Sequence, residues 1–220
     1  MFDRIENLLG KDVFSKFQGK RILIVGIGGV GGIVLEALVR SGFDNITIID
    51  KDVFEISNNN RQLMCNIKSI NKKKVVVAKK KMKNINPKCK INALFMFLDK
   101  DNIQKLGDFD YIVDTCDTID TKLELYKYAE KNSIKIISSM GMGKRVDLSK
   151  IKIGRLDKTL NDPLAKKIRF LCKQSGINPK IPVVTSSELP KKTKNITSMF
   201  TVTNTAGILI ADYIIKDIIK

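Results

Sequence analysis

The sequence predicts an α/β fold with a doubly wound, mostly parallel sheet and a C-terminal extension. Short apolar runs typical of buried strands alternate with longer segments of helical period up to about residue 145. The first strand, Arg21–Val25, passes through a glycine-rich turn directly into a helix. Beyond residue 145 the regular alternation stops, so we assign residues 146–220 to the extension.

The expected elements follow one another along the whole chain, after a helical leader at residues 1–19. The expected strands are 21–25, 46–49, 90–98, 111–114, 134–137 and 151–156, and the helices are 33–39, 72–85, 101–106, 118–131, 163–173 and 199–219. Residues 185–198 are polar and lysine-rich, which predicts a mobile loop. We find no internal repeat and therefore expect a single domain over 1–220, with a nucleotide-binding core at about 20–145.

A glycine-rich turn follows the first strand in the segment RILIVGIGGVG. Its glycines are Gly26, Gly28, Gly29 and Gly31. Glycine lets the backbone approach phosphate groups, and the helix that follows offers free N–H groups and the positive end of its dipole. Strand, turn and helix in this order predict a phosphate site in a Rossmann-like sheet. A tight turn without any ligand also fits the spacing, so other residues must decide.

Acidic residues follow the second strand. Asp50 comes directly after the apolar run ITII, and Asp52 lies two positions further. An acid at this strand end holds the ribose hydroxyls in nucleotide-binding sheets. Carboxylates at this place can also cap the next turn, an alternative that the sequence leaves open.

A polar run, SNNNRQ, follows these acids and has no helical period. It contains Asn60, Arg61 and Gln62, and Lys74 lies near the start of the next expected helix. Arginine suits phosphate because its planar fork makes paired, charge-assisted hydrogen bonds. A plain loop is the alternative for the run, and a solvated helix face is the alternative for most lysines nearby.

Two aspartates flank the end of the fourth strand. Asp114 and Asp117 lie in the segment YIVDTCDT, and ligands of open α/β sheets bind at this edge. A carboxylate here can hold Mg²⁺ against phosphate oxygens. Either residue could instead cap the following helix.

The composition excludes several kinds of chemistry. The chain has no histidine, which rules out histidine-based catalysis and zinc sites that need histidine. Its four cysteines form no C-x-x-C pair, so we expect no zinc. We expect a cytoplasmic protein with reduced thiols and no membrane span, since the apolar run 199–211 is too short. The formal net charge of +17 suits a polyanionic partner or reflects composition bias.

The combination GIGGVG, IIDKD, SNNNRQ, Lys74 and DTCD resembles the ubiquitin-activating-like adenylating superfamily, which includes ThiF, MoeB and HesA. Within it the chain is most similar to the tRNA threonylcarbamoyladenosine dehydratase branch. The segments that carry this likeness are FDRIENLLG, LDKTLNDPLAKKIR, VVTSSE and FTVTNTAGILIAD.

The resemblance implies roles for single residues. The four glycines, Asp50, Asp52, Asn60, Arg61, Gln62 and Lys74 would bind ATP; Arg61, Lys74, Asp117 and Arg4 would be catalytic; and Asp117 would hold Mg²⁺. Arg4 would reach the triphosphate of a partner subunit, which implies a homodimer. The implied reaction is ATP-dependent adenylation of the threonyl carboxylate at tRNA position 37, followed by cyclisation with loss of water.

The implied partner is tRNA, for which the basic helix with Lys166, Lys167, Arg169 and Lys173 is the candidate surface. A monovalent cation and a cysteine desulfurase or sulfur-acceptor system are left open. The alternative function is ThiF- or MoeB-like activation of a small sulfur-carrier or ubiquitin-like protein, although the zinc cysteines common there are absent. An NAD(P)-binding oxidoreductase or redox module would leave SNNNRQ, Lys74 and Asp117 unexplained.

Overall fold

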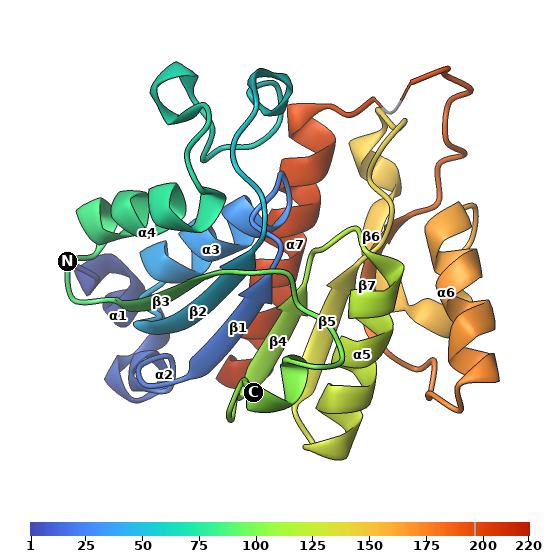
Figure 1. Cartoon of the computed structure of the whole chain (residues 1–220). Helices are drawn as coiled ribbons and strands as arrows, with labels where there is room; N and C mark the ends of the chain where they lie inside the picture. Colours follow the sequence, from blue (N-terminus) through green and yellow to red (C-terminus); the bar gives the residue numbers. More distant parts are fainter. Residues whose placement is uncertain (196) are drawn as a thin grey trace.

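The computed structural model describes residues 1–195 and 197–220 (Figure 1). Its strands form one seven-stranded sheet in the order β3-β2-β1-β4-β5-β7-β6. The strands are β1 Arg21–Val25, β2 Asn45–Asp50, β3 Lys90–Phe95, β4 Tyr111–Asp114, β5 Lys135–Ser139, β6 Ile151–Arg155 and β7 Pro182–Ser186. Neighbouring strands are parallel except β6 and β7, which are antiparallel. The predicted doubly wound, mostly parallel sheet is therefore confirmed.

Helices cover both faces of this sheet (Figure 1). They are α1 Asp3–Leu9, α2 Lys11–Ser15, α3 Gly31–Arg40, α4 Lys74–Ile85, α5 Ile119–Lys131, α6 Pro163–Gln174 and α7 Phe200–Ile219, with short 3₁₀ turns η1 Ile56–Asn58, η2 Ile67–Ser69, η3 Ile103–Lys105, η4 Leu148–Lys150 and η5 Leu156–Lys158. One large core joins α2, α3, α4 and α7 to one face of the sheet. Two smaller cores join α5 and α6 to the other face.

The C-terminal residues complete the same sheet and the same core. Strands β6 and β7 continue the sheet beyond β5, and α7 packs closely against α3. Gly207 makes this approach possible, since a Cβ atom there would lie 2.7 Å from the carbonyl oxygen of Val30 and 2.8 Å from Ile33. The first and last parts of the chain therefore share one hydrophobic interior.

The loop expected at 185–198 begins later in the structure than the sequence predicts. Thr185 and Ser186 are buried and belong to β7, a strand that the sequence prediction missed. Polar residues occupy the end of this strand because the Thr185 hydroxyl hydrogen-bonds the buried Asp162 carboxylate at 3.4 Å. Residues 187–195 and 197–199 form neither helix nor strand, and residue 196 lies outside the described residues. In the described residues, no helix has both the length and the apolar character needed to cross a membrane.

The strand order places a topological switch between β1 and β4. Strand β1 pairs with β2 on one side and with β4 on the other, all in parallel. Connections from these strands therefore leave in opposite directions and open a crevice at their carboxyl ends, which is where open α/β sheets bind ligands.

Candidate functional site

A cavity of about 550 Å³ lies at this switch point, and its size suits a small organic ligand. It gathers nine of the residues that the sequence singled out. These are Gly26, Gly28, Gly29, Asp50, Asp52, Arg61, Gln62, Lys74 and Asp117. The predicted site residues thus come from five separate segments of the chain to one place.

The glycine turn is shaped by contacts that exclude side chains. Gly26 has a φ of +92°, and a Cβ atom there would lie 2.8 Å from the backbone of Thr115. Gly31 does not line the cavity, but its Cβ atom would collide with the carbonyl oxygen of Gly26. At Gly28 the nearest atom to such a Cβ is the Gln62 Nε2, at 4.0 Å, and this glycine faces the cavity. Gly28 therefore keeps space open for a ligand, whereas Gly26 and Gly31 let the turn close.

Two alanine variants are expected to separate these roles. Gly28→Ala places a methyl group in open space, so it should keep the melting temperature but raise the Kd for Mg-ATP about tenfold or more. Gly31→Ala forces the turn apart, and strain or overpacking of this kind costs about 1–3 kcal/mol of folding free energy. Thermal unfolding and isothermal titration with Mg-ATP measure both effects. Equal nucleotide affinity of Gly28→Ala and the parent would contradict the assignment of this glycine.

Asp50 links the glycine turn to the second strand. One of its carboxylate oxygens accepts a hydrogen bond from the backbone N–H of Ile27 at 2.6 Å, and the other accepts from Asp52 at 2.8 Å. Burial raises the pKa of the Asp50 carboxyl above its ordinary value, although Lys74 and the two backbone N–H groups oppose this shift. Asp50 thus fixes the turn and still presents its carboxylate to the cavity.

Lys74 and Asp52 form an ion pair in the cavity wall. The Lys74 Nζ lies 3.1 Å from a carboxylate oxygen of Asp52, and Lys51 binds the other oxygen at 3.1 Å. The Lys74 side chain is only 8% exposed, whereas that of Asp52 is 48% exposed. Burial raises the pKa of Asp52, but attraction and hydrogen bonds from Lys74 and Lys51 outweigh it and hold the pKa below the ordinary value. The buried ammonium group is therefore positioned by a carboxylate and remains close to the cavity.

The polar run SNNNRQ belongs to a loop that is anchored in the core. Its base is closed by backbone hydrogen bonds between residues 52–54 and 71–74. Phe54 and Met64 are fully buried on either side of the run, and Asn58 and Gln62 are buried within it. The run therefore also packs into the core, which its polar composition did not indicate.

Arg61 and Gln62 face the cavity from this loop. The Arg61 Nη1 donates to the carbonyl of Ser57 at 2.9 Å and to the Asn60 side chain at 3.1 Å, which leaves Nε and Nη2 without partners among the described residues. The Gln62 Oε1 is buried and also lacks a partner within the described residues. Unpartnered buried polar atoms are costly and point to a missing ligand or water. Asn60 does not line the cavity; its amide donates to the carbonyl of Ser198 at 3.0 Å.

Asn204 and Thr203 contact residues of the site from behind, and the sequence did not predict this. Both lie on the first turn of α7 and are buried. The Asn204 amide donates to the carbonyl of Arg61 at 3.1 Å, and the Thr203 hydroxyl lies 3.0 Å from the place of a Cβ atom on Gly29. Polar residues interrupting the apolar positions of this helix, in the segment TVTNTAG, were the available signal. The start of α7 therefore supports both the arginine loop and the glycine turn.

Asp114 and Asp117 have different environments. Asp114 is fully buried and paired with Lys122 Nζ at 2.9 Å and with the Ser138 hydroxyl at 2.5 Å. Asp117 is exposed and lines the cavity. In the described part of the chain no three His, Cys, Asp or Glu side chains gather as a metal site. A single carboxylate is nevertheless the donor set that suits Mg²⁺, which takes its other ligands from phosphates and water.

Other predicted residues lie outside the cavity. Arg4 is exposed on α1 and does not line it. Lys166, Lys167 and Lys173 are exposed on α6. Arg169 is half-buried, and its guanidinium donates to the carbonyls of Leu156 and Thr159 at 3.3 and 3.0 Å. Arg169 therefore supports the turn at η5 and is not a free surface charge.

Taken together, the switch-point crevice, the glycine turn, the strand-end acid and the arginine–lysine wall define a nucleotide-binding α/β protein built to handle phosphate groups. The chain belongs to the ThiF family, whose model matches residues 2–220. The resemblance drawn from the sequence is thereby confirmed.

Named relatives indicate which branch of the ThiF family this chain resembles. The chain is 36% identical over 191 residues to the tRNA threonylcarbamoyladenosine dehydratase of Bacillus subtilis, covering 86% of this chain and 75% of the relative. It is 36% identical to the enzyme of that name from Haemophilus influenzae, covering 81% and 70%. It superimposes with a TM-score of 0.92 on Escherichia coli TcdA, a tRNA N6-threonylcarbamoyladenosine dehydratase crystallised with ATP, at 30% identity over 99% of this chain and 93% of that one.

Proposed function

We propose that this protein is an ATP-dependent tRNA threonylcarbamoyladenosine dehydratase. The threonyl carboxylate of the modified adenosine attacks the α-phosphorus of ATP, and the bond to pyrophosphate breaks. The carbamoyl nitrogen of the same nucleoside then attacks the activated carbonyl, releases AMP and closes a ring. One carboxylate oxygen leaves on AMP, so the nucleoside loses one water in total.

The observation that carries this proposal is the convergence of Arg61, Gln62, Lys74 and Asp117 on the cavity beside the glycine turn. The free N–H groups of Arg61 and the ammonium of Lys74 neutralise negative charge on the phosphates. Gln62 and the turn backbone orient them, and Asp50 and Asp52 hold the ribose side. Both nucleophiles belong to substrates, so positioning and charge neutralisation suffice.

The metal part of the proposal rests on Asp117. This exposed carboxylate would hold Mg²⁺ at the cavity, and the ion would supply additional positive charge against the phosphates.

Activation of a small carrier protein is the competing function. Enzymes that conjugate such carriers take over the acyl group on a cysteine thiolate. Cys116 is the cysteine that lines the cavity in the described residues, and its thiol donates to Asp114 at 3.1 Å. Burial and the Asp114 carboxylate raise the pKa of the Cys116 thiol well above its ordinary value. This thiol stays protonated and is a poor acyl acceptor, which favours a reaction that ends with AMP release.

The proposal includes a homodimer in which Arg4 serves the partner's site. We place the dimer contact on the face formed by α7 and η4, because this face carries exposed apolar side chains. Phe200 and Ile208 on α7 are 45% and 52% exposed, and Leu148 on the neighbouring η4 is 40% exposed. Exposed apolar groups of this kind mark association surfaces.

A complementation test addresses the shared site. Arg4→Ala and Asp117→Ala are each expected to lower AMP release at least 100-fold. In a mixed dimer, one of the two sites keeps both the intact Arg4 and the intact Asp117, so mixing the inactive variants should restore about a quarter of the parental activity. Subunit exchange is checked with differently tagged chains. Exchange without recovered activity would contradict a site shared between subunits.

The proposal also includes binding partners and a cellular location. We propose tRNA as the macromolecular substrate, with Lys166, Lys167 and Lys173 as surface contacts, and a cytoplasmic location. A cysteine desulfurase or sulfur-acceptor system is a further candidate partner.

The decisive experiment measures AMP release from labelled ATP with and without tRNA that carries threonylcarbamoyladenosine. Mass analysis of the nucleosides follows. The proposal expects AMP release only with this tRNA, together with a nucleoside that has lost one water. AMP or pyrophosphate exchange independent of tRNA would contradict it and point to a carrier protein, and binding of NADH without Mg-ATP would exclude adenylation.

A further inference from the structure

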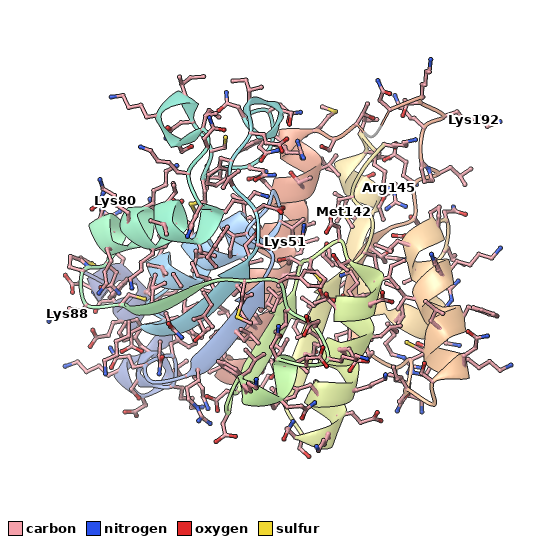
Figure 2. All side chains as sticks on the ribbon, viewed as in Figure 1. Lys51, Lys80, Lys88, Met142, Arg145 and Lys192 are labelled. Carbon is pink, nitrogen blue, oxygen red and sulfur yellow. The ribbon has the colours of Figure 1, made fainter. Side chains whose placement is uncertain are left out.

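Residues 56–98 carry a large excess of positive over negative charge. This stretch contains one arginine, ten lysines and no acidic residue. Seven of the lysines are exposed: Lys68, Lys72, Lys73, Lys79, Lys80, Lys88 and Lys90. We call these seven the basic belt; they lie on η2, on and just before α4, and just before or at the start of β3. Figure 2 shows Lys80 and Lys88 on the α4 side of the molecule, opposite Lys192.

The belt lysines are not used to hold the fold. Among the described residues, none of the seven forms an ion pair, whereas lysines elsewhere pair with acids, as Lys127 does with Glu124 and Lys216 with Asp212. Like charges this close repel one another and gain nothing from folding. A surface of this kind suits a polyanion, because phosphates would neutralise the lysines and release counterions.

The belt adjoins the cavity, since Lys73 directly precedes the lining residue Lys74, and exposed aromatic side chains lie beside it. Lys73 lies 4.3 Å from the ring centroid of Phe95, which is 41% exposed. Phe97 is 43% exposed and lines the cavity itself. Exposed aromatic rings beside lysines are the features that bind single-stranded nucleic acid, since bases stack on the rings while the lysines follow the phosphates.

We propose that the basic belt binds the RNA strand on one side of the reacting nucleotide, with Phe95 as a stacking surface for a flanking base. This inference rests on the proposed function, because the nucleotide that reacts must enter the cavity from an RNA chain. Its neighbours must then lie beside the cavity, close to the lining residues Lys74 and Met96, which directly follow Lys73 and Phe95 in the chain. The belt thus contributes a contact surface separate from the lysines of α6.

Charge-neutralising variants test the belt. The belt variant combines Lys72→Gln, Lys79→Gln and Lys80→Gln; glutamine keeps the helix propensity of lysine. The control combines Lys105→Gln, Lys127→Gln and Lys131→Gln, which are exposed on η3 and α5 and give the same charge change. The belt variant is expected to raise the Kd for tRNA at least tenfold and to lower the salt slope of binding by about three. The control should stay within threefold of the parent.

A stacking variant tests Phe95. Phe95→Leu keeps an apolar side chain but removes the aromatic face, so the Kd for tRNA should rise at least fivefold with an unchanged salt slope. In the AMP assay, both belt and Phe95 variants should raise KM for tRNA and leave KM for ATP unchanged.

The outcomes separate this inference from the proposed function. A parent protein that releases AMP with modified tRNA, while the belt variant matches the control in Kd and salt slope, would overturn the belt and leave the function standing. A parent that releases no AMP with this tRNA would overturn the function, whatever the belt variant does. Loss of binding to an acidic carrier protein rather than to tRNA in the belt variant would assign the belt to a protein partner and overturn the inference.

Discussion

Arg61→Ala is expected to lower the rate of AMP formation about 1,000-fold, because an arginine that neutralises transferring phosphate groups contributes on this scale. Its side chain is half-exposed and makes two hydrogen bonds within its own loop, to Ser57 and Asn60. Their loss costs about 1–2 kcal/mol at most. The loop is held instead by buried Phe54 and Met64 and by Asn204. Activity should therefore fall far more than stability.

Arg40→Ala is the matched control for this prediction. Arg40 lies on α3, 59% exposed, and pairs with Glu36 one helical turn away. An exposed pair of this kind contributes less than about 1 kcal/mol, so activity should stay within twofold. Single-turnover AMP release and thermal unfolding are measured on both variants. Full activity in Arg61→Ala would contradict the catalytic role of this arginine. Full activity in Asp117→Ala would likewise contradict the role of Asp117.

The sequence predicted the residues that line the cavity better than it predicted the residues that hold them in place. Glycine spacing and strand-end acids are local patterns, so Gly26, Gly28, Asp50 and Asp117 could be assigned without tertiary contacts. Lys74 could be named because it lies near the start of the expected helix that follows the polar run. These residues are confirmed as neighbours around one cavity, while their catalytic roles stay predictions.

The missed features depend on contacts between distant segments. Asn204 supports Arg61 across 143 positions of the chain; the polar residues of TVTNTAG mark this place in the sequence, but no local pattern names the partner. Strand β7 was missed because Thr185 and Ser186 are polar, yet Thr185 is satisfied by Asp162 in the interior. Arg169 resembled a surface charge in a basic helix but binds backbone carbonyls at η5. In each case a buried partner, absent from the local sequence, decides the role.

Lys122→Met is expected to destabilise the fold by about 3–5 kcal/mol, because it leaves the buried carboxylate of Asp114 without its cation. Lys122 and Asp114 are both fully buried. The ammonium also donates to the Ser138 hydroxyl at 3.2 Å and to the carbonyl of Ser139 at 2.9 Å, and thereby ties α5 to β4 and β5. Chemical denaturation measures the loss, and Lys127→Met, an exposed change on the same helix, serves as the control.

The double variant Asp114→Asn with Lys122→Met separates charge imbalance from lost packing. Removing both charges leaves no unpaired ion, so the double variant should recover at least 1–2 kcal/mol relative to Lys122→Met. A double variant no more stable than the single one would show that hydrogen bonds to Ser138 and Ser139 dominate. The ion pair also lies directly before the Cys116–Asp117 turn, since Asp114 accepts from the Cys116 thiol and backbone. A double variant that regains stability but not AMP release would therefore show that this buried pair positions Asp117 at the cavity.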